Sequence, residues 1–560
     1  MRRWNGWGDD STDYPLPEPA RDYLAGLVGR GSTTVDAPMD QLLAAVPASR
    51  LPASPLLSLE PKDRLLHACG QSLPDWVGLH TGRLPAFPDA VAYARTEEHV
   101  RTVLALCRQS GAALIPYGGG TSVVGHINPL PGGPPTVTLD LSPLQRLLSL
   151  DETNSVAVFE AGVRGPDLEE KLAAQGYTLG HFPQSFEFST LGGWIATRSC
   201  GQQSFHYGRI EDLFAGGHVE TPVGAMDLPE LPASAAGPDL RHLLLGSEGR
   251  LGVITRASVR VRRRPETESF SGVFFHDWAS GAEAVREIAQ SGLAVSMLRL
   301  SDAQETETTL VLAGKPNLTL WAERGLRLAG YRSERSLLIL GITGEQLRTH
   351  ETLRHATAIC RRHGGLFPIA MIGRMWQKSR FLAPYLRNTL WSCGYTLDTV
   401  ETALSWSRVL PAARTIQQTL RDAFEARGER LLVFTHLSHI YTDGASVYTT
   451  FLFRRAADPD ETVATWRLAK QAVSRAIVNL GGTISHQHGV GIDHAPFLEA
   501  EKGRTGIALL QAACRTLDPD GMLNPGKLVP AQGERVGPIP FVLIPGADPF
   551  PPARSEGMAR

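Results

Sequence analysis

Apolar and polar positions follow a helical period in the stretch that runs from Thr96 to Gly111. Thr96 is a typical N-cap residue, and the acidic residues after it suit the positive end of a helix dipole. Gly111 is a typical residue to end a helix. The pattern therefore predicts one helix between these two positions. Its apolar stripe consists of Val100, Val103, Leu104 and Cys107.

Other stretches alternate in the manner of strands or repeat in the manner of helices. The expected strands are Ala112–Pro116, Thr136–Leu141, Ser155–Ala161, Ser336–Ile342 and Val447–Phe453. The expected helices are Pro61–Cys69, Gly165 to about Gln175, Thr349–His363 and Thr462–Leu480. Helices and strands are thus mixed along the chain, which predicts an α+β fold.

Composition narrows the class of protein. The 560 residues are too many for one ordinary core, so two or three domains are expected. A net charge of −2 provides no strong field for nucleic acid. The six cysteines are scattered without a CxxC pair, which argues against disulfides and against a cysteine-rich metal site.

The beginning of the chain, MRRWNGWGDD, is not followed by an apolar run and does not read as a signal peptide. No apolar stretch approaches the roughly 20 residues that span a bilayer. The sequence therefore predicts a cytoplasmic protein, with peripheral membrane contact left open. The last thirty residues are rich in proline and are expected to be an extended arm or disordered.

The first of three glycine-containing motifs follows an expected strand. Three glycines in a turn let backbone N–H groups converge on an anion, and two hydroxyls add further donors. Pyrophosphate is the expected guest, and an ordinary tight turn is the alternative. The spacing is not that of a dinucleotide-binding GxGxxG. The motif consists of Pro116, Tyr117, Gly118, Gly119, Gly120, Thr121 and Ser122.

The second and third motifs are suited to a flat ring system and to a bent backbone packed against it. Aromatic residues in the second motif argue against a solvated surface loop. The second motif consists of Gln184, Ser185, Phe186, Glu187, Phe188, Ser189 and Thr190, followed by Thr197, Arg198, Ser199 and Cys200. The third consists of Glu248, Gly249, Arg250, Leu251, Gly252, Val253 and Ile254.

Together, these motifs resemble the FAD-binding domain of the vanillyl-alcohol-oxidase and p-cresol-methylhydroxylase (PCMH) family. The resemblance implies a PCMH-type domain of two subdomains that hold FAD, plus an α/β cap domain for the substrate. Residues 1–83 would pack on the flavin domain, residues 84–264 would form it, and residues 265–510 would form the cap. Residues 511–560 would be a C-terminal segment. The first two motifs hold no Cys or His at 116–122 or 184–190, so FAD is expected to be non-covalent.

Four further segments resemble the alkyldihydroxyacetonephosphate synthases: Trp4–Gly8, Phe188–Trp194, Gly208–Leu213 and His486–His488. This resemblance implies a transferase that exchanges the acyl chain of acyl-dihydroxyacetone phosphate for a fatty alcohol, in ether lipid synthesis, without net redox change. The flavin's reactive nitrogen would trap the substrate carbon while the fatty acid leaves. Family members are often homodimers, and the sequence shows no interface.

The same resemblance implies roles for single residues. Tyr448 matches an essential tyrosine that removes and returns a proton on the substrate's first carbon. Arg387 matches a substrate-binding arginine, and His486, Gln487 and His488 match a three-histidine run. As a base, Tyr448 would need its pKa lowered by cations such as His488 or Arg387.

His486 and His488 permit several interpretations. On a strand they would share a face, yet a metal site needs further ligands, and His436 and His439 could supply nitrogens. Metal is therefore disfavoured, and we expect none. Recognition of phosphate or carboxylate by His486, Gln487, His488 and Arg387 fits the donors better. Structural packing near the flavin is the remaining alternative.

Two features of the sequence depart from the synthase pattern and favour a second hypothesis. Gln487 replaces the middle histidine, and Leu523–Leu528 looks more like FAD-linked 2-hydroxyacid dehydrogenases. The alternative is therefore an oxidoreductase that acts on a 2-hydroxyacid or another alcohol. A non-enzymatic flavin-binding lipid carrier is disfavoured, because a carrier needs no converging Tyr, Arg and His.

Overall fold

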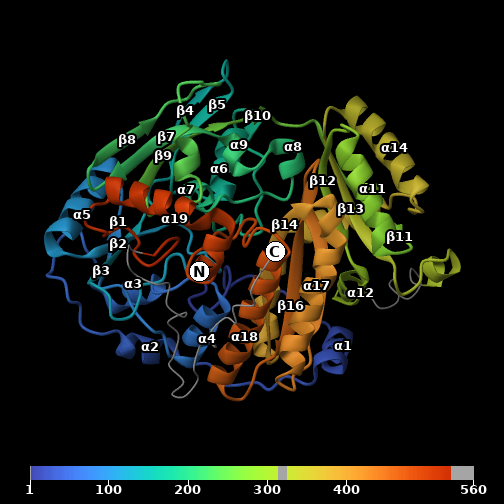
Figure 1. Ribbon diagram of the computed structural model, residues 1–560, viewed down its shortest axis with the longest axis horizontal. Helices are drawn as coiled ribbons and strands as arrows, with labels where there is room; N and C mark the ends of the chain where they lie inside the picture. The colour runs from blue at the N-terminus through green and yellow to red at the C-terminus, as the bar shows by residue number, and fades with distance from the viewer. Residues whose placement is uncertain (1, 313–323, 531–560) are drawn as a thin grey trace, which may run out of the picture.

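Three main sheets organise the chain in the computed structural model, which describes residues 2–312 and 324–530 (Figure 1). Two smaller sheets belong to the part of the chain that carries the glycine motifs. The third and largest sheet lies beside them and is built from residues from Thr267 onward. The proline-rich residues after 530 lie outside the described part.

The first sheet is parallel and has the order β1-β3-β2. Its strands are β1 (Ala90–Tyr93), β2 (Ala113–Tyr117) and β3 (Thr136–Asp140). Helix α5 (Glu97–Ser110) connects β1 to β2. Thr96 caps it by accepting a hydrogen bond from the His99 amide, and Gly111 ends it with φ of 65°. The predicted helix is therefore confirmed, and its whole apolar stripe is buried.

The second sheet is antiparallel, with the order β4-β5-β9-β7-β8. Its strands are β4 (Leu147–Asp151), β5 (Val156–Glu160), β7 (Phe214–Thr221), β8 (Gly224–Leu228) and β9 (Val253–Arg260). Helices α6 and α7 and the short α9 share its core. The bounds of the connecting elements are α6 (Gly165–Ala173), β6 (Tyr177–Thr178), α7 (Leu191–Thr197), α8 (Ser204–Tyr207), α9 (Ile210–Leu213), α10 (Arg241–Leu244) and β10 (Arg262–Arg263).

The third sheet is antiparallel, with the order β11-β13-β12-β15-β16-β14. Its strands are β11 (Thr267–Phe275), β12 (Val295–Ser301), β13 (Ser336–Gly344), β14 (Tyr395–Ser405), β15 (Leu432–Ile440) and β16 (Gly444–Arg454). The four long helices that contribute to its core are α11 (Trp278–Gln290), α14 (Gln346–Arg362), α17 (Trp406–Glu425) and α18 (Pro459–Asn479).

Side-chain alternation gives this sheet two different faces. Leu437, Val447 and Phe451 pack with the four helices in one continuous core. The residues between them, such as Phe434, His436 and Tyr448, are only partly buried or line a cavity on the other side. The helices of this side are α12 (Ala303–Leu312), α15 (Ala370–Ser379), η1 (Ala383–Tyr385) and α16 (Leu386–Ser392).

The N-terminal segment, which we expected on the flavin domain, packs on both domains. Its elements are α1 (Glu18–Val28), α2 (Met39–Ala45), α3 (Pro61–Leu66) and α4 (Leu73–Thr81). Leu16 and Leu24 join a core with Leu432 of β15, whereas Leu51 and Leu57 join the core of the first sheet.

The residues after 490 return to the flavin side. They form η2 (Ala495–Phe497) and α19 (Leu498–Leu517), which crosses the flavin side in Figure 1. The Leu114 amide donates to the Met522 carbonyl, so the segment that follows α19 lies beside β2. Within the described residues, no helix is both long enough and apolar enough to cross a bilayer. All six cysteines are free thiols.

Candidate active site

A cavity of about 1470 Å³ lies between the three glycine motifs and one face of the six-stranded sheet, the face that carries Phe434, His436 and Tyr448. All seven residues of the first motif line it. On the sheet side, the lining is apolar at residues such as Phe274, Met297, Ile339 and Phe434. The sequence-predicted motifs and the predicted Tyr448 therefore meet in one space.

The glycine turn after β2 presents unpaired backbone donors. In the described part of the chain, no hydrogen bond within the protein uses the N–H groups of Gly118 through Ser122. Gly119 is required because a Cβ there would collide with the Phe188 carbonyl of the second motif. Consecutive unpaired amides that line a cavity are suited to an anionic diphosphate, so this turn fits FAD.

The second and third motifs line the cavity only in part. The residues that line it are Gln184, Ser185, Ser189, Thr190, Thr197, Ser199, Cys200, Glu248, Gly249, Gly252 and Ile254. Seven residues predicted to bind the cofactor do not line it: Phe186, Glu187, Phe188, Arg198, Arg250, Leu251 and Val253. Their assignment as cofactor-binding residues stays a prediction.

Six of these side chains contact other parts of the protein. Phe186 stacks on Phe381 at 5.0 Å between ring centroids, and Phe188 meets Trp7 edge-on at 5.7 Å. The Arg198 guanidinium pairs with Glu211 at 3.1 Å. The buried Arg250 donates to the Leu523 carbonyl, Leu251 packs with Cys514 of α19, and Val253 belongs to the core of the first sheet.

Glu248 lines the cavity, but its carboxylate connects two loops. It accepts hydrogen bonds from the amides of Val490 and Gly491, the second at 2.9 Å, and pairs with His126 at 3.2 Å. Asn524 donates to the Glu248 carbonyl at 2.7 Å and also lines the cavity. Leu523–Leu528 therefore organises the flavin side, a role that its own sequence did not reveal.

Tyr448 and Arg387 line the cavity, and we call the part of the cavity around them its polar centre. The Tyr448 hydroxyl donates to Thr399 Oγ1 at 3.2 Å. The Arg387 guanidinium stacks on Trp76 at 4.3 Å and donates to the Gln71 carbonyl at 2.8 Å. Burial lowers the pKa of Arg387 to about 10, so it remains a cation at neutral pH.

The pKa of Tyr448 departs from our expectation. Burial and the neighbouring Glu401 carboxylate raise it above its ordinary value, and the opposing effect of Arg387 is smaller. Arg387 thus lowers this pKa as expected, but burial and Glu401 outweigh it and the net shift is upward. Tyr448 is a protonated phenol in this state.

The His-Gln-His segment is a loop rather than a strand, so its two histidines do not share a face. Gln487 and His488 line the cavity. His486 is not among the lining residues; its Nε2 contacts the Tyr441 hydroxyl at 2.6 Å and Arg209 at 2.8 Å. These contacts make His486 a buried support of the loop, and its predicted catalytic role stays a prediction. Burial holds its pKa well below the ordinary value.

Glu401 of β14 holds this loop and is not among the residues that the sequence predicted for the site. Its Oε1 accepts hydrogen bonds from the amides of Gln487 at 2.7 Å and His488 at 2.8 Å, and lies 3.4 Å from His488 Nδ1. Burial raises the pKa of Glu401, but His488 and the amides outweigh this effect and lower it overall. Only strand pairing, which the local sequence does not specify, could have identified this residue.

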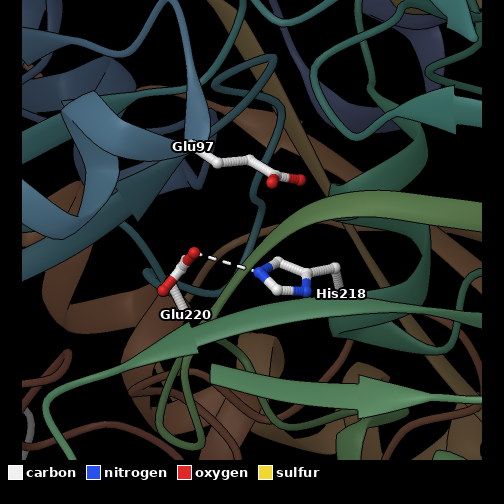
Figure 2. A group of neighbouring side chains, drawn as sticks. All are labelled: Glu97, His218 and Glu220. Carbon is white, nitrogen blue, oxygen red and sulfur yellow. Dashed lines mark hydrogen bonds and ion pairs between the residues drawn. The ribbon is translucent and has the colours of Figure 1, made fainter. Parts of the chain in front are cut away.

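Within the described residues, the two histidines considered as extra metal ligands do not form a group with His486 and His488 at metal-ligand spacing. His436 Nδ1 lies 3.0 Å from Glu305, and His439 Nδ1 lies 3.2 Å from Cys200 Sγ. In the described residues, three side chains lie close enough together to hold a metal ion at a different place, shown in Figure 2. That group consists of Glu97, His218 and Glu220.

This group is an ion-pair network outside the cavity lining. His218 Nε2 lies 3.0 Å from Glu220 and Nδ1 lies 2.6 Å from Asp227. Arg101 pairs with the same Glu220 at 2.9 Å. Because these carboxylates already have cationic partners, we assign no metal to the group.

Comparison with known proteins agrees with this architecture. The family model described as "FAD binding domain" matches residues 88–226, and that described as "FAD linked oxidases, C-terminal domain" matches residues 264–528. The fold and the cavity thus define an FAD-linked flavoprotein with a PCMH-type flavin domain and a cap. FAD is its cofactor.

Individual relatives narrow the class. The alkyldihydroxyacetonephosphate synthase of Dictyostelium discoideum is 31% identical over 86% of this chain and 79% of its own length. That of Trypanosoma brucei brucei is 28% identical over 85% of this chain and 78% of its own. A solved alkyldihydroxyacetonephosphate synthase structure superposes with a TM-score of 0.81 and 26% identity, covering 94% of this chain and 98% of the other. The chain belongs to the alkyldihydroxyacetonephosphate synthase family.

Proposed function

We propose that this enzyme exchanges the acyl chain of acyl-dihydroxyacetone phosphate for a fatty alcohol, with bound FAD and without net redox change. The observation that carries the proposal is the placement of Tyr448, Arg387 and His488 in one cavity with the glycine turn. The family membership shared with named synthases supports the same reaction.

The cavity provides for both chemical halves of such a substrate. Arg387 is a permanent cation whose planar guanidinium suits a phosphate. Apolar side chains from two hydrophobic clusters also line the cavity. One group comprises Phe274, Met297, Leu337, Ile339 and Trp376; the other comprises Leu312, Leu386, Leu397 and Phe434. Either group offers alkyl chains an environment from which water is excluded.

FAD, when bound, supplies an electrophilic ring that holds the substrate carbon during exchange. The chain's own residues would orient the phosphate through Arg387 and handle protons at Tyr448. Because Tyr448 is protonated at rest, it is ready to return a proton to the first carbon. To remove one, it must first pass its own proton to a neighbouring group.

The test is an anaerobic incubation of the flavin-loaded enzyme with acyl-dihydroxyacetone phosphate and an isotope-labelled fatty alcohol. Mass spectrometry should find the labelled alkyl ether and an equal amount of released fatty acid, with no electron acceptor present. Absence of the ether, together with flavin bleaching by a simple 2-hydroxyacid, would instead establish the oxidoreductase that Leu523–Leu528 suggested.

We also propose peripheral contact with a lipid surface. Phe367 and Met371 are 64% and 47% exposed, while Met371 and its neighbours Leu366 and Ile369 line the cavity. This arrangement would let a lipid enter from a membrane. Replacing Phe367 and Met371 by Ser should reduce co-sedimentation with anionic phospholipid vesicles, whereas Leu509→Ser, on exposed α19, should not. Equal binding by both variants would contradict the contact.

A further inference from the structure

The proposed reaction, on which this inference rests, requires two separate proton transfers. One proton leaves the first carbon of the substrate and later returns to it. A second leaves the alcohol hydroxyl, because the alcohol enters as ROH and remains as an ether oxygen, while the departing acid is released as a carboxylate. The first task belongs to Tyr448 in the proposed function, and the second has no assigned group.

His436 lies directly across from Tyr448. The two residues are register partners in the β15–β16 pair, and their rings stack at 4.9 Å between centroids with an angle of 17°. His488 meets the Tyr448 ring edge-on, at 5.7 Å. Tyr448 is therefore flanked by two histidines, and each of them is paired with a buried glutamate.

The glutamate of His436 is Glu305, which lies at the start of α12 and is 4% exposed. Its Oε1 lies 3.0 Å from His436 Nδ1. Arg299 Nη2 is 3.1 Å from Nδ1 but only 2.6 Å from the same Oε1, so it donates to the carboxylate. Burial raises the pKa of Glu305, but Arg299 and His436 outweigh this and lower it overall.

This pairing fixes the tautomer of His436. An ionised carboxylate can only accept, so Nδ1 carries the hydrogen and Nε2 carries the lone pair. In the described part of the chain, no hydrogen bond uses Nε2. Burial and Arg299 lower the pKa of His436, against the effect of Glu305, and His439 adds to the lowering. The imidazole is therefore a neutral base.

The position of His436 suits an alcohol. It lines the cavity between the polar centre and Phe434, which is two residues earlier on the same face of β15. Leu397 and Leu312 belong to the same apolar group. An alkyl chain on this side would bring its hydroxyl to the imidazole while the chain stays among apolar side chains.

We propose that His436, oriented by Glu305, is the general base that takes the proton of the incoming fatty alcohol. The alcohol O–H bond breaks, its proton moves to Nε2, and its oxygen pair forms the new bond to the first carbon of the substrate. The acyl carboxylate has left with the electron pair of its own bond. The proton then passes to solvent, and no electrons are gained or lost overall.

The variant His436→Asn tests this assignment. The asparagine amide keeps a donor near Glu305 but has no nitrogen in place of Nε2. Two steps are measured on the flavin-loaded variant: exchange of the first-carbon hydrogen with deuterated water in the absence of alcohol, and ether formation with alcohol. We expect exchange to change little and ether formation to fall by roughly 10²–10⁴-fold, the usual contribution of general acid–base catalysis.

His276→Asn is the matched control. His276 also stacks on a tyrosine, Tyr331, at 4.2 Å, and neither residue lines the cavity. Both steps should stay at the wild-type rate in this variant. Failure of wild-type enzyme to form the ether would overturn the proposed function itself, which is a different outcome from a defect confined to His436→Asn.

A fluorinated fatty alcohol provides an independent readout. Its hydroxyl is more acidic and depends less on a general base, so it should recover a large part of the lost ether formation in His436→Asn. Equal loss of exchange and ether formation, or no preference for the fluorinated alcohol, would show that His436 only supports the fold. Full activity of the variant would also overturn the assignment.

Discussion

Glu401 lies opposite Tyr448 in the β14–β16 pair, and its carboxylate also holds the loop that carries His488. Burial raises the pKa of Tyr448, and this buried acid raises it further while it positions a histidine beside the tyrosine. Glu401 therefore acts on both the protonation of Tyr448 and the position of its neighbour. This relationship, rather than the His-Gln-His pattern alone, defines the polar centre.

Replacement of Tyr448 by Phe should abolish ether formation and leave FAD bound. The ring and its contact with His436 remain, and only the hydroxyl that handles the proton of the first carbon is lost. Flavin absorbance and ether production are measured on the same sample. An active Tyr448→Phe enzyme would exclude the tyrosine as the proton carrier.

Glu401→Gln should lower both stability and turnover. The amide retains an acceptor for the loop but loses the charge that faces His488, so we expect a loss of about 1–3 kcal/mol in unfolding free energy. Thermal melting of the flavin-loaded protein measures it. Glu345→Gln, at a 64% exposed side chain, is the control and should melt with the wild type. Identical melting of all three proteins would refute the structural role of Glu401.

Arg387→Lys should weaken recognition of the phosphate. The lysine keeps a charge but loses the planar fork and the stacking on Trp76, so the KM for acyl-dihydroxyacetone phosphate should rise by about tenfold or more. Arg348→Lys, at a 79% exposed side chain, should leave it unchanged. If the KM stays constant in Arg387→Lys, the phosphate is bound elsewhere in the cavity.

Gly119→Ala should prevent FAD binding. A Cβ at this position would collide with the backbone of Phe188, where no flexible side chain can move aside. Gly133→Ala is a suitable control because the nearest atom to its added Cβ is the Leu130 carbonyl at 3.5 Å. The ratio of flavin to protein absorbance after purification measures the effect. Normal flavin content in Gly119→Ala would mean that the turn can open.

His218 should make stability depend on pH. Burial lowers its pKa, but hydrogen bonds to Asp227 and Glu220 outweigh burial and raise it overall. Its contribution is therefore complete below the unfolded pKa of about 6.5 and is lost as pH rises through the folded value. The melting difference between wild type and His218→Gln should be larger at pH 6 than at pH 9. A constant difference would contradict the ion-pair network.

The sequence was sufficient to predict the elements that depend on residues close together in the chain. Thr96 and Gly111 mark the ends of α5, and the glycines of 118–120 mark the turn that lines the cavity. The expected strands at 112–116 and 336–342 agree with β2 and β13 to within a few residues. Caps, turns and apolar periods depend on neighbours in the chain, so they can be read without the fold.

The missed residues depend on pairing between distant segments. Glu401 and His436 reach Tyr448 only because β14 and β15 flank β16. Glu305 reaches His436 from helix α12. The shared face considered for His486 and His488 required a strand, and the segment is a loop. The loop instead places His486 against Arg209.

The contacts of Asn524 and Arg2 bear on how the cofactor site is made during protein synthesis. Arg2 donates to the Gly119 carbonyl at 2.6 Å, and Asn524 holds the backbone of Glu248 and His126. Residues from opposite ends of the described chain thus complete the same flavin-binding region. On the ribosome, a nascent chain would lack the Asn524 contacts until this residue had emerged. Capture of FAD would therefore report that synthesis had passed Asn524, and chains terminated before it would remain colourless.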